Sequence, residues 1–243
     1  MKLAIMQPYF LPYIGYFQLI NAVDKFIFCD DVHFIKGGFI NRNHILVNQS
    51  KDHQSHGKQV KYRFTIPVQH VHFDTTIRET KVANDPANWC RKLSKTLQNY
   101  RKAPYFKTIY PVFDEILRGS IGRSISDVAI ESIETTLKYI NLERKTATTF
   151  SRYNNTHLSG AERIVDICRQ ESATTYVNAI GGQKLFSKDY FSANALKLQF
   201  LKPNLTTYKQ NSPLFIAGLS IIDVLMWNDP DAVNKMLSDY ILI

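Results

Sequence analysis

The sequence predicts an α/β protein with a mostly parallel, doubly wound sheet of the Rossmann-like or nucleotidyltransferase-like kind, carrying a helical insertion. Short apolar runs of strand length alternate with helical segments at both ends of the chain, and a run of helices separates these two regions. The 243 residues, 44% of them hydrophobic, are enough for one large core. We therefore predict one α/β domain over residues 1–243, with residues 85–141 as a helical insertion or subdomain.

The first strand–helix–strand unit occupies the N-terminal thirty residues or so. The apolar run KLAIM, residues 2–6, predicts a buried strand, which Pro8 ends. Residues 15–23 follow as a short helix with one apolar side, and KFIFC, residues 25–29, predicts a second strand. Two short strands joined by a helix indicate parallel pairing with a right-handed crossover.

The middle of the chain is expected to be mainly helical. Residues 48–58 are polar and predict a loop, and residues 62–68 alternate as a strand does, with Pro67 placing that strand at an edge or an end. Asp85 and Pro86 predict a helix start, as N-cap and first-turn proline. The helices expected in the insertion span about 85–100, 104–117 and 126–140.

The α/β alternation returns after the insertion. The expected strands are 147–150, 174–178 and 196–201, and the expected helices are 159–170, 187–193 and 220–227. Ser220 is the expected N-cap of the last helix, and Asp223 at its third position completes an acidic variant of the capping box.

Composition narrows the class of protein. The net charge of +9 favours anionic partners such as nucleotides, phosphosugars, nucleic acid or an anionic membrane face, although solubility explains it equally well. Three widely spaced cysteines without a CxxC pair argue against a disulfide framework and for a reducing compartment. No apolar stretch approaches the roughly 20 residues of a membrane helix, and no signal-peptide cleavage site follows the N-terminal run. We predict a cytoplasmic protein.

Familiar catalytic motifs are missing. GxSxG, HExxH, Walker A and GxGxxG do not occur. His70 and His72 would share a strand face, but spacing places no third ligand, so no metal is predicted. Cys29 and His33 could form a nucleophile pair, although a cysteine that ends an apolar strand is more often buried and inert.

The segment Gln7–Tyr16 is the first candidate for ligand binding. Open α/β sheets bind ligands outside the carboxyl end of the first strand, near a helix N-terminus. Tyrosine rings and hydroxyls suit a sugar or a base, and a glycine lets a ligand approach the backbone. Packing beneath the sheet is the alternative for the rings. The candidate residues are Gln7, Tyr9, Tyr13 and Gly15.

A second candidate segment follows the second strand. Neighbouring carboxylates on a strand point oppositely, so one of Asp30 and Asp31 should face the site and the other a cap or turn. Either could act as general base for an amine or hold a sugar hydroxyl, and Lys36 could neutralise phosphate. A solvated Asx turn followed by a glycine turn is the alternative. The candidate catalytic residues are Asp30, Asp31 and Lys36; the candidate binding residues are Asn41, Arg42 and Asn43.

Two further groups complete the prediction. Asn178, Gly181 and Gly182 stand where a strand runs into a helix, and their amides could cradle an anion, although a tight turn explains the glycines nearly as well. Gln210 follows Tyr208 and Lys209 and could reach a ligand.

The loop before the first helix resembles the phosphate loop of the class-I nucleotidyltransferase superfamily. Those proteins carry HxGH, which binds ATP, where this chain has Tyr13-Ile14-Gly15-Tyr16. Tyrosine has no cationic form to stabilise a polyphosphate leaving group, which argues against adenylyl transfer.

Five blocks extend a resemblance over essentially the whole chain. In order they are MQPYFLPYIGYFQLINAVDKFIF, DDVHFIKGGFINRNHIL, YVNAIGGQKLF, YKQ and LSIIDVL. Together they resemble the WbqC-like protein family. The resemblance implies a bacterial protein of the kind encoded in O-antigen and other surface-polysaccharide clusters, and a role in lipopolysaccharide synthesis.

That resemblance suggests a transferase forming an amide between an acyl or aminoacyl group and a nucleotide-linked amino sugar. Lys36 and Arg42 would take the diphosphate, Tyr9 and Tyr13 would stack on the base or sugar, and one of the two aspartates would accept the amine proton. ATP, an activated acyl donor and aminoacyl-tRNA are the candidate co-substrates. The alternatives are a nucleotidyltransferase-like enzyme that binds a nucleoside triphosphate, and a non-catalytic binding or scaffold protein of the same pathway.

Overall fold

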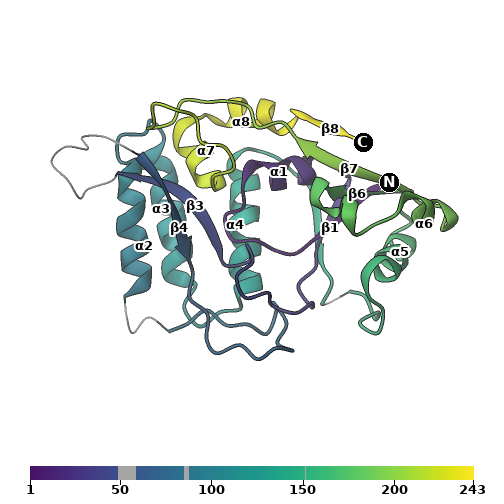
Figure 1. Cartoon of the computed structure of the whole chain (residues 1–243). Coiled ribbons are helices and arrows are strands. Elements are labelled where there is room, and N and C mark those ends of the chain that lie inside the picture. The colour runs from purple at the N-terminus through teal and green to yellow at the C-terminus, as the bar shows by residue number, and fades with distance from the viewer. Residues whose placement is uncertain (49–58, 85–87, 151) are drawn as a thin grey trace.

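A six-stranded sheet organises the chain (Figure 1). The computed structural model describes residues 1–48, 59–84, 88–150 and 152–243. The strand order is β5-β2-β1-β6-β7-β8, with all neighbours parallel except the antiparallel pair of β7 and β8. This confirms the predicted mostly parallel, Rossmann-like sheet. Its strands are β1 Lys2–Met6, β2 Lys25–Phe28, β5 Lys145–Thr148, β6 Thr175–Ala179, β7 Lys197–Pro203 and β8 Tyr240–Leu242.

Both faces of the sheet are covered, which explains why its inner strands read as continuous apolar runs. Successive side chains of a strand point to opposite faces, so Ala4 and Phe26 enter one core while Leu3 and Ile27 enter the other. The first core lies under three helices: α1 Ile14–Asn21, α4 Ile125–Tyr139 and α8 Pro230–Leu237. The second lies under α5 Gly160–Gln170 and α6 Lys188–Ala193.

Strand order reverses in the middle of the sheet. From β1 the chain adds β2 and then β5 on one side, and it then returns to add β6, β7 and β8 on the other side of β1. The reversal point therefore lies between β1 and β6. In open α/β sheets, ligands bind in the crevice outside the carboxyl ends of the strands at such a point.

The connection from β2 to β5 holds a hairpin as well as the predicted helices. Strands β3 (Arg42–Asn48) and β4 (Gln59–Thr65) form a separate antiparallel pair. Phe64 of β4 meets Phe10 edge to face at 6.2 Å, and the helices contribute buried residues to the same core cluster as α1. The helices before α4 are α2 Trp89–Leu97, the short 3-10 helix η1 Gln98–Tyr100 and α3 Phe106–Gly119.

Several local predictions differ from the structure. The hairpin strand expected at 62–68 lies at 59–65, before Pro67, which cannot donate a backbone hydrogen bond. Strand β3, helix α8 and strand β8 were not predicted. Helix α2 begins at Trp89 after a left-handed Asn88. The predicted cap at Asp85 and Pro86, and most of the predicted 48–58 loop, lie outside the described residues.

For the last predicted helix, the structure confirms the N-cap at Ser220 but not the capping box with Asp223. Helix α7 spans Ile221–Trp227, and the Ser220 hydroxyl accepts a hydrogen bond from the Ile222 N–H. The capping box is wrong, because the Ser220 N–H donates to the His44 carbonyl at 2.8 Å and the Asp223 carboxylate points to other partners. The other element of this region, η2 Ile180–Lys184, follows β6 directly.

Candidate functional site

The carboxyl ends of β1, β2, β5 and β6 meet at one edge of the sheet, here called the carboxyl edge. The Cys29 N–H donates to the Met6 carbonyl at 2.8 Å, and the Thr149 N–H donates to the Phe28 carbonyl at 2.9 Å. Each strand end is thus held level with its neighbour. The segments at this edge are 7–16, 29–31, 149–150 and 178–182.

The loop after β1 is held in a fixed shape. Leu11 adopts a left-handed conformation, with a φ of 46°, which is unfavourable for a residue with a side chain. Its N–H donates to the Ser132 hydroxyl at 3.1 Å, and its carbonyl accepts from the Asn43 amide at 2.7 Å and the Ser220 hydroxyl at 2.8 Å. Three distant segments therefore stabilise a strained backbone, as preorganised loops require.

The tyrosines of this loop have different roles. Tyr16 is 3% exposed and donates its hydroxyl to the Gln7 carbonyl at 2.8 Å, so it is a packing residue. Tyr9 and Tyr13 are half-buried, and burial raises the pKa of both. A Cβ on Gly15 would lie 2.4 Å from the Tyr13 ring. The Tyr13 ring can therefore take this position only because residue 15 is a glycine. A ligand reaches the Gly15 backbone only if that ring moves.

Asp30 lies inside the protein. It is 0% exposed, and its carboxylate accepts from the Ser126 hydroxyl at 3.1 Å and the Phe150 N–H at 3.1 Å. Burial raises its pKa, and those hydrogen bonds lower it in part. Asp30 thus joins β2 to α4 and to the end of β5.

Asp31 forms a buried ion pair that the sequence did not reveal. Its carboxylate accepts from the Thr149 hydroxyl at 2.6 Å and from Arg163 Nη2 of α5 at 2.6 Å. The Thr149 hydroxyl also lies 3.3 Å from Asp30 Oδ1. Both carboxylates therefore approach Thr149.

The ion pair continues into a chain of polar contacts. Arg163 Nε donates to the Asn155 side chain at 3.0 Å, which donates in turn to Asp166 at 2.7 Å. Arg163 was missed in the sequence, although it lies among the buried residues of α5 with Ile167. An arginine on an apolar helix face is the signal that could have revealed it, since buried charges are paired.

Cys29 lies beside these carboxylates, but burial raises the pKa of its thiol to about 12. The thiol is therefore protonated at neutral pH, which argues against the nucleophile pair with His33. His33 itself is exposed and forms a β-bridge with Thr76.

The remaining predicted residues of this segment are divided between surface and interior. Lys36 is exposed. The Asn41 amide donates to the Ile66 carbonyl at 2.7 Å, so Asn41 and Asn43 both hold the hairpin in place. Arg42 begins β3, and its Nε is enclosed without an acceptor among the described residues. The ligand-binding role of these three residues stays a prediction.

The turn after β6 is closely packed on one side and open on the other. A Cβ on Gly182 would lie 2.3 Å from the Asn178 amide nitrogen, so Asn178 fills the space over that glycine. Asn178 Oδ1 accepts from the Ala179 N–H at 2.8 Å. Gly181 is exposed, with open space where a Cβ would stand.

Gln210 belongs to a different cluster, built around the fully buried Asp223. The carboxylate accepts from Tyr100 Oη at 2.6 Å, Tyr208 Oη at 2.7 Å and Gln210 Nε2 at 3.1 Å. Burial raises the pKa of Asp223, and these three donors lower it in part. The cluster ties the irregular 204–219 segment to α7 and η1. The ligand-binding role of Gln210 stays a prediction.

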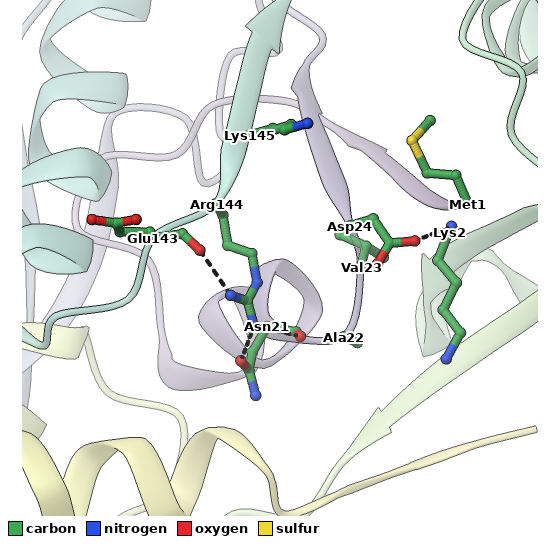
Figure 2. A pocket seen from close by; sticks show the side chains of 9 residues that line it. All are labelled: Met1, Lys2, Asn21, Ala22, Val23, Asp24, Glu143, Arg144 and Lys145. Atoms are coloured by element: carbon green, nitrogen blue, oxygen red, sulfur yellow. Dashed lines mark hydrogen bonds between the residues drawn. The ribbon is translucent and has the colours of Figure 1, made fainter.

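An open hollow lies at the opposite, amino edge of the sheet (Figure 2). Its volume is about 750 Å³, and the Arg144 guanidinium crosses it to the Asn21 side chain at 2.8 Å. None of the residues predicted from sequence contributes to it. It is lined by Met1, Lys2, Asn21, Ala22, Val23, Asp24, Glu143, Arg144 and Lys145.

Comparison with known proteins shows which family this chain belongs to. A family model described as the WbqC-like protein family matches residues 7–235, from the loop after β1 to the last helix. The chain belongs to the WbqC-like protein family. This WbqC-like protein is also 27% identical, over 226 residues and 92% of both chains, to the uncharacterized protein Rv1507c of Mycobacterium tuberculosis. No solved structure matches it.

The family assignment confirms the resemblance seen in the sequence. Throughout the described ranges of this WbqC-like protein, no helix has both the length and the apolar character needed to cross a membrane. The predicted cytoplasmic location stays a prediction.

Proposed function

We propose that this WbqC-like protein is a transferase of bacterial surface-polysaccharide (O-antigen) synthesis. It would form an amide between an acyl or aminoacyl group and a nucleotide-linked amino sugar bound at the carboxyl edge. The supporting observation is the reversal of strand order between β1 and β6, the kind of point at which open α/β sheets bind ligands; the fixed loop follows β1 and the turn at Gly181 follows β6.

Ring faces and amides are available at this edge for such a substrate. The Tyr9 ring lies 6.4 Å from the ring of Phe39, which is 55% exposed, and two such rings suit a base or a sugar. The open backbone at Gly181 suits a phosphate oxygen.

Asp31 is the better of the two proton acceptors. Asp30 is 0% exposed, whereas the Asp31 side chain keeps 7% exposure and is held by Thr149 and Arg163. In the proposed step the sugar amine attacks the acyl carbonyl carbon and a C–N bond forms. The bond to the donor's leaving group breaks, the leaving group keeps the electron pair, and Asp31 takes the amine proton. The donor is an activated acyl compound: a thioester, an acyl adenylate or an aminoacyl ester.

Mass spectrometry tests the proposal directly. The protein is incubated with an acyl thioester or aminoacyl ester and a nucleotide-linked amino sugar, and we expect one acyl group to replace one amine hydrogen. Asp31→Asn should lower kcat about 100-fold or more, because a general base contributes at least that much, while KM for the sugar changes little. Asp231→Asn, at an exposed position of α8, is the matched control and should leave both unchanged.

The alternatives give different products. A nucleotidyltransferase would release pyrophosphate from a nucleoside triphosphate, but the inward-facing Tyr16 hydroxyl offers such a leaving group nothing. A scaffold protein would tolerate both Asp31→Asn and Arg42→Ala without loss of polysaccharide in cells. If the folded Asp31→Asn variant gives an unchanged mass gain, the assignment of Asp31 as the general base is refuted.

A further inference from the structure

A group of four basic side chains lies on one face of the hairpin, and is here called the basic cluster. Side chains alternate along each strand and the register pairs His44 with Arg63, so Arg42 and His44 of β3 share a face with Lys61 and Arg63 of β4. Lys61 and Arg63 are exposed, and Arg42 and His44 are half-buried. Within the described part of the chain, none of the four has a carboxylate partner.

The four side chains extend over about 14 Å of the hairpin, with His44 and Arg63 at the centre. The His44 carbonyl accepts from the Ser220 N–H at 2.8 Å, so it faces away from β4. His44 and Arg63 therefore form a non-hydrogen-bonded pair, in which opposing side chains come nearest. Their Cβ atoms lie about 5 Å apart, with Arg42 about 7 Å along β3 toward one end of the hairpin and Lys61 about 7 Å along β4 toward the other end.

This arrangement is unfavourable on its own. Arg63 stands directly opposite His44, and like charges in such a pair would destabilise the hairpin when His44 is protonated. Desolvation, then Lys61, then Arg63 lower the pKa of His44, so the neighbours resist its protonation. Arg42 adds the cost of an enclosed Nε without an acceptor among the residues described. An anion would relieve all three costs.

The hairpin is tied to the loop after β1. The Asn43 amide donates to the Leu11 carbonyl at 2.7 Å, and the Phe10 N–H donates to the Ile40 carbonyl at 2.8 Å. Figure 1 shows the hairpin beside this loop. The basic cluster is thus anchored next to the carboxyl edge.

We propose that the basic cluster binds the diphosphate of the nucleotide-linked substrate, an inference that rests on the function proposed above. The central pair of His44 and Arg63 offers one place for a compact dianion or trianion, and the long side chains of Arg42 and Lys61 flank that place on opposite sides. Arginine binds phosphate through a fork of N–H donors and lysine as a point charge, and the cluster holds both. His44, Lys61 and Arg63 thereby join Arg42 in the role that Lys36 was expected to share.

Titration with inorganic pyrophosphate tests this site without any activity assay. The His44 imidazole is followed by NMR, and we expect saturable binding that raises its pKa, because a nearby anion favours the imidazolium. Uridine diphosphate should do the same and uridine should not. Lys61→Gln and Arg63→Gln should each weaken binding about tenfold, the loss of one charge-assisted contact. Lys197→Gln, at an exposed position of β7, should change nothing.

The variants carry their own folding check. Arg63→Gln should raise the His44 pKa in the free protein, which happens only if the hairpin is formed. A folded variant that binds pyrophosphate as tightly as the wild type would overturn the site. Salt-dependent transfer-RNA binding that needs Lys61 and Arg63, without pyrophosphate binding, would overturn it in favour of nucleic acid.

The two proposals can fail separately. Pyrophosphate binding at the basic cluster without acyl transfer would support the anion site and refute the transferase proposal. Acyl transfer with a KM for the nucleotide sugar that Arg63→Gln does not change would refute the anion site and support the transferase proposal.

Discussion

Arg163 and Asp31 show how two side chains can join distant parts of the sheet. The pair links the end of β2 to the first turn of α5 at 2.6 Å, with both side chains less than a tenth exposed. Such a pair is weak evidence for net stability, because desolvation offsets attraction. Removing one partner is different, since it leaves a buried charge alone.

Arg163→Met should therefore destabilise the protein by about 3–5 kcal/mol, through the Asp31 carboxylate left behind. Urea unfolding followed by circular dichroism measures this. The double variant Arg163→Met with Asp31→Leu should recover most of the loss, because no unpaired charge remains. Equal destabilisation in the single and double variants would show that packing, not charge, is what Arg163 provides.

The loop after β1 behaves as an element in its own right, although it contains no regular structure. Its shape depends on the left-handed Leu11 and on contacts to Ser132, Asn43 and Ser220. Its contact with α1 depends on Gly15, over which the Tyr13 ring lies. The conformation of the loop therefore determines where helix α1 begins.

Gly15→Ala should displace the Tyr13 ring and destabilise the protein by about 1–3 kcal/mol, the usual cost of overpacking. Gly15→Ala combined with Tyr13→Ala should lose little beyond Tyr13→Ala alone, because the obstruction is gone. Thermal denaturation of the four proteins in this cycle gives the coupling. Additive losses would show that the ring and the glycine are independent.

The molecule as a whole has two cores, one on each face of the sheet, and the insertion shares the first of them. Phe113 of α3 and Phe17 of α1 are both buried in that cluster. The helices of the insertion therefore pack against the α/β core and not only against one another.

Phe113→Ala should lower the free energy of unfolding by about 3–5 kcal/mol and leave a single transition. Urea unfolding followed by both tryptophan fluorescence and far-ultraviolet circular dichroism should give one midpoint. Two separated midpoints, with only one moved by the substitution, would show that residues 85–141 unfold as a subdomain of their own.

The sequence by itself determined five of the six strands of the sheet, all except β8. After their first lysines, KLAIM and KFIF are apolar because both faces of a parallel sheet are covered, and that property is local to each strand. Helix starts were less certain, as at Trp89, because several polar residues compete for a cap. Strand β3 was hidden because its first residues serve the loop after β1 and not a core.

Only the tertiary structure decided which polar groups meet. Thr149 and Arg163 reach Asp31 from 118 and 132 residues away, and His44 faces Arg63 only through the register of the hairpin. Such contacts depend on strand order, register and crossover direction, which arise when distant segments pack. No periodicity within one segment encodes them, so the residue types could be chosen from the sequence while their partners could not.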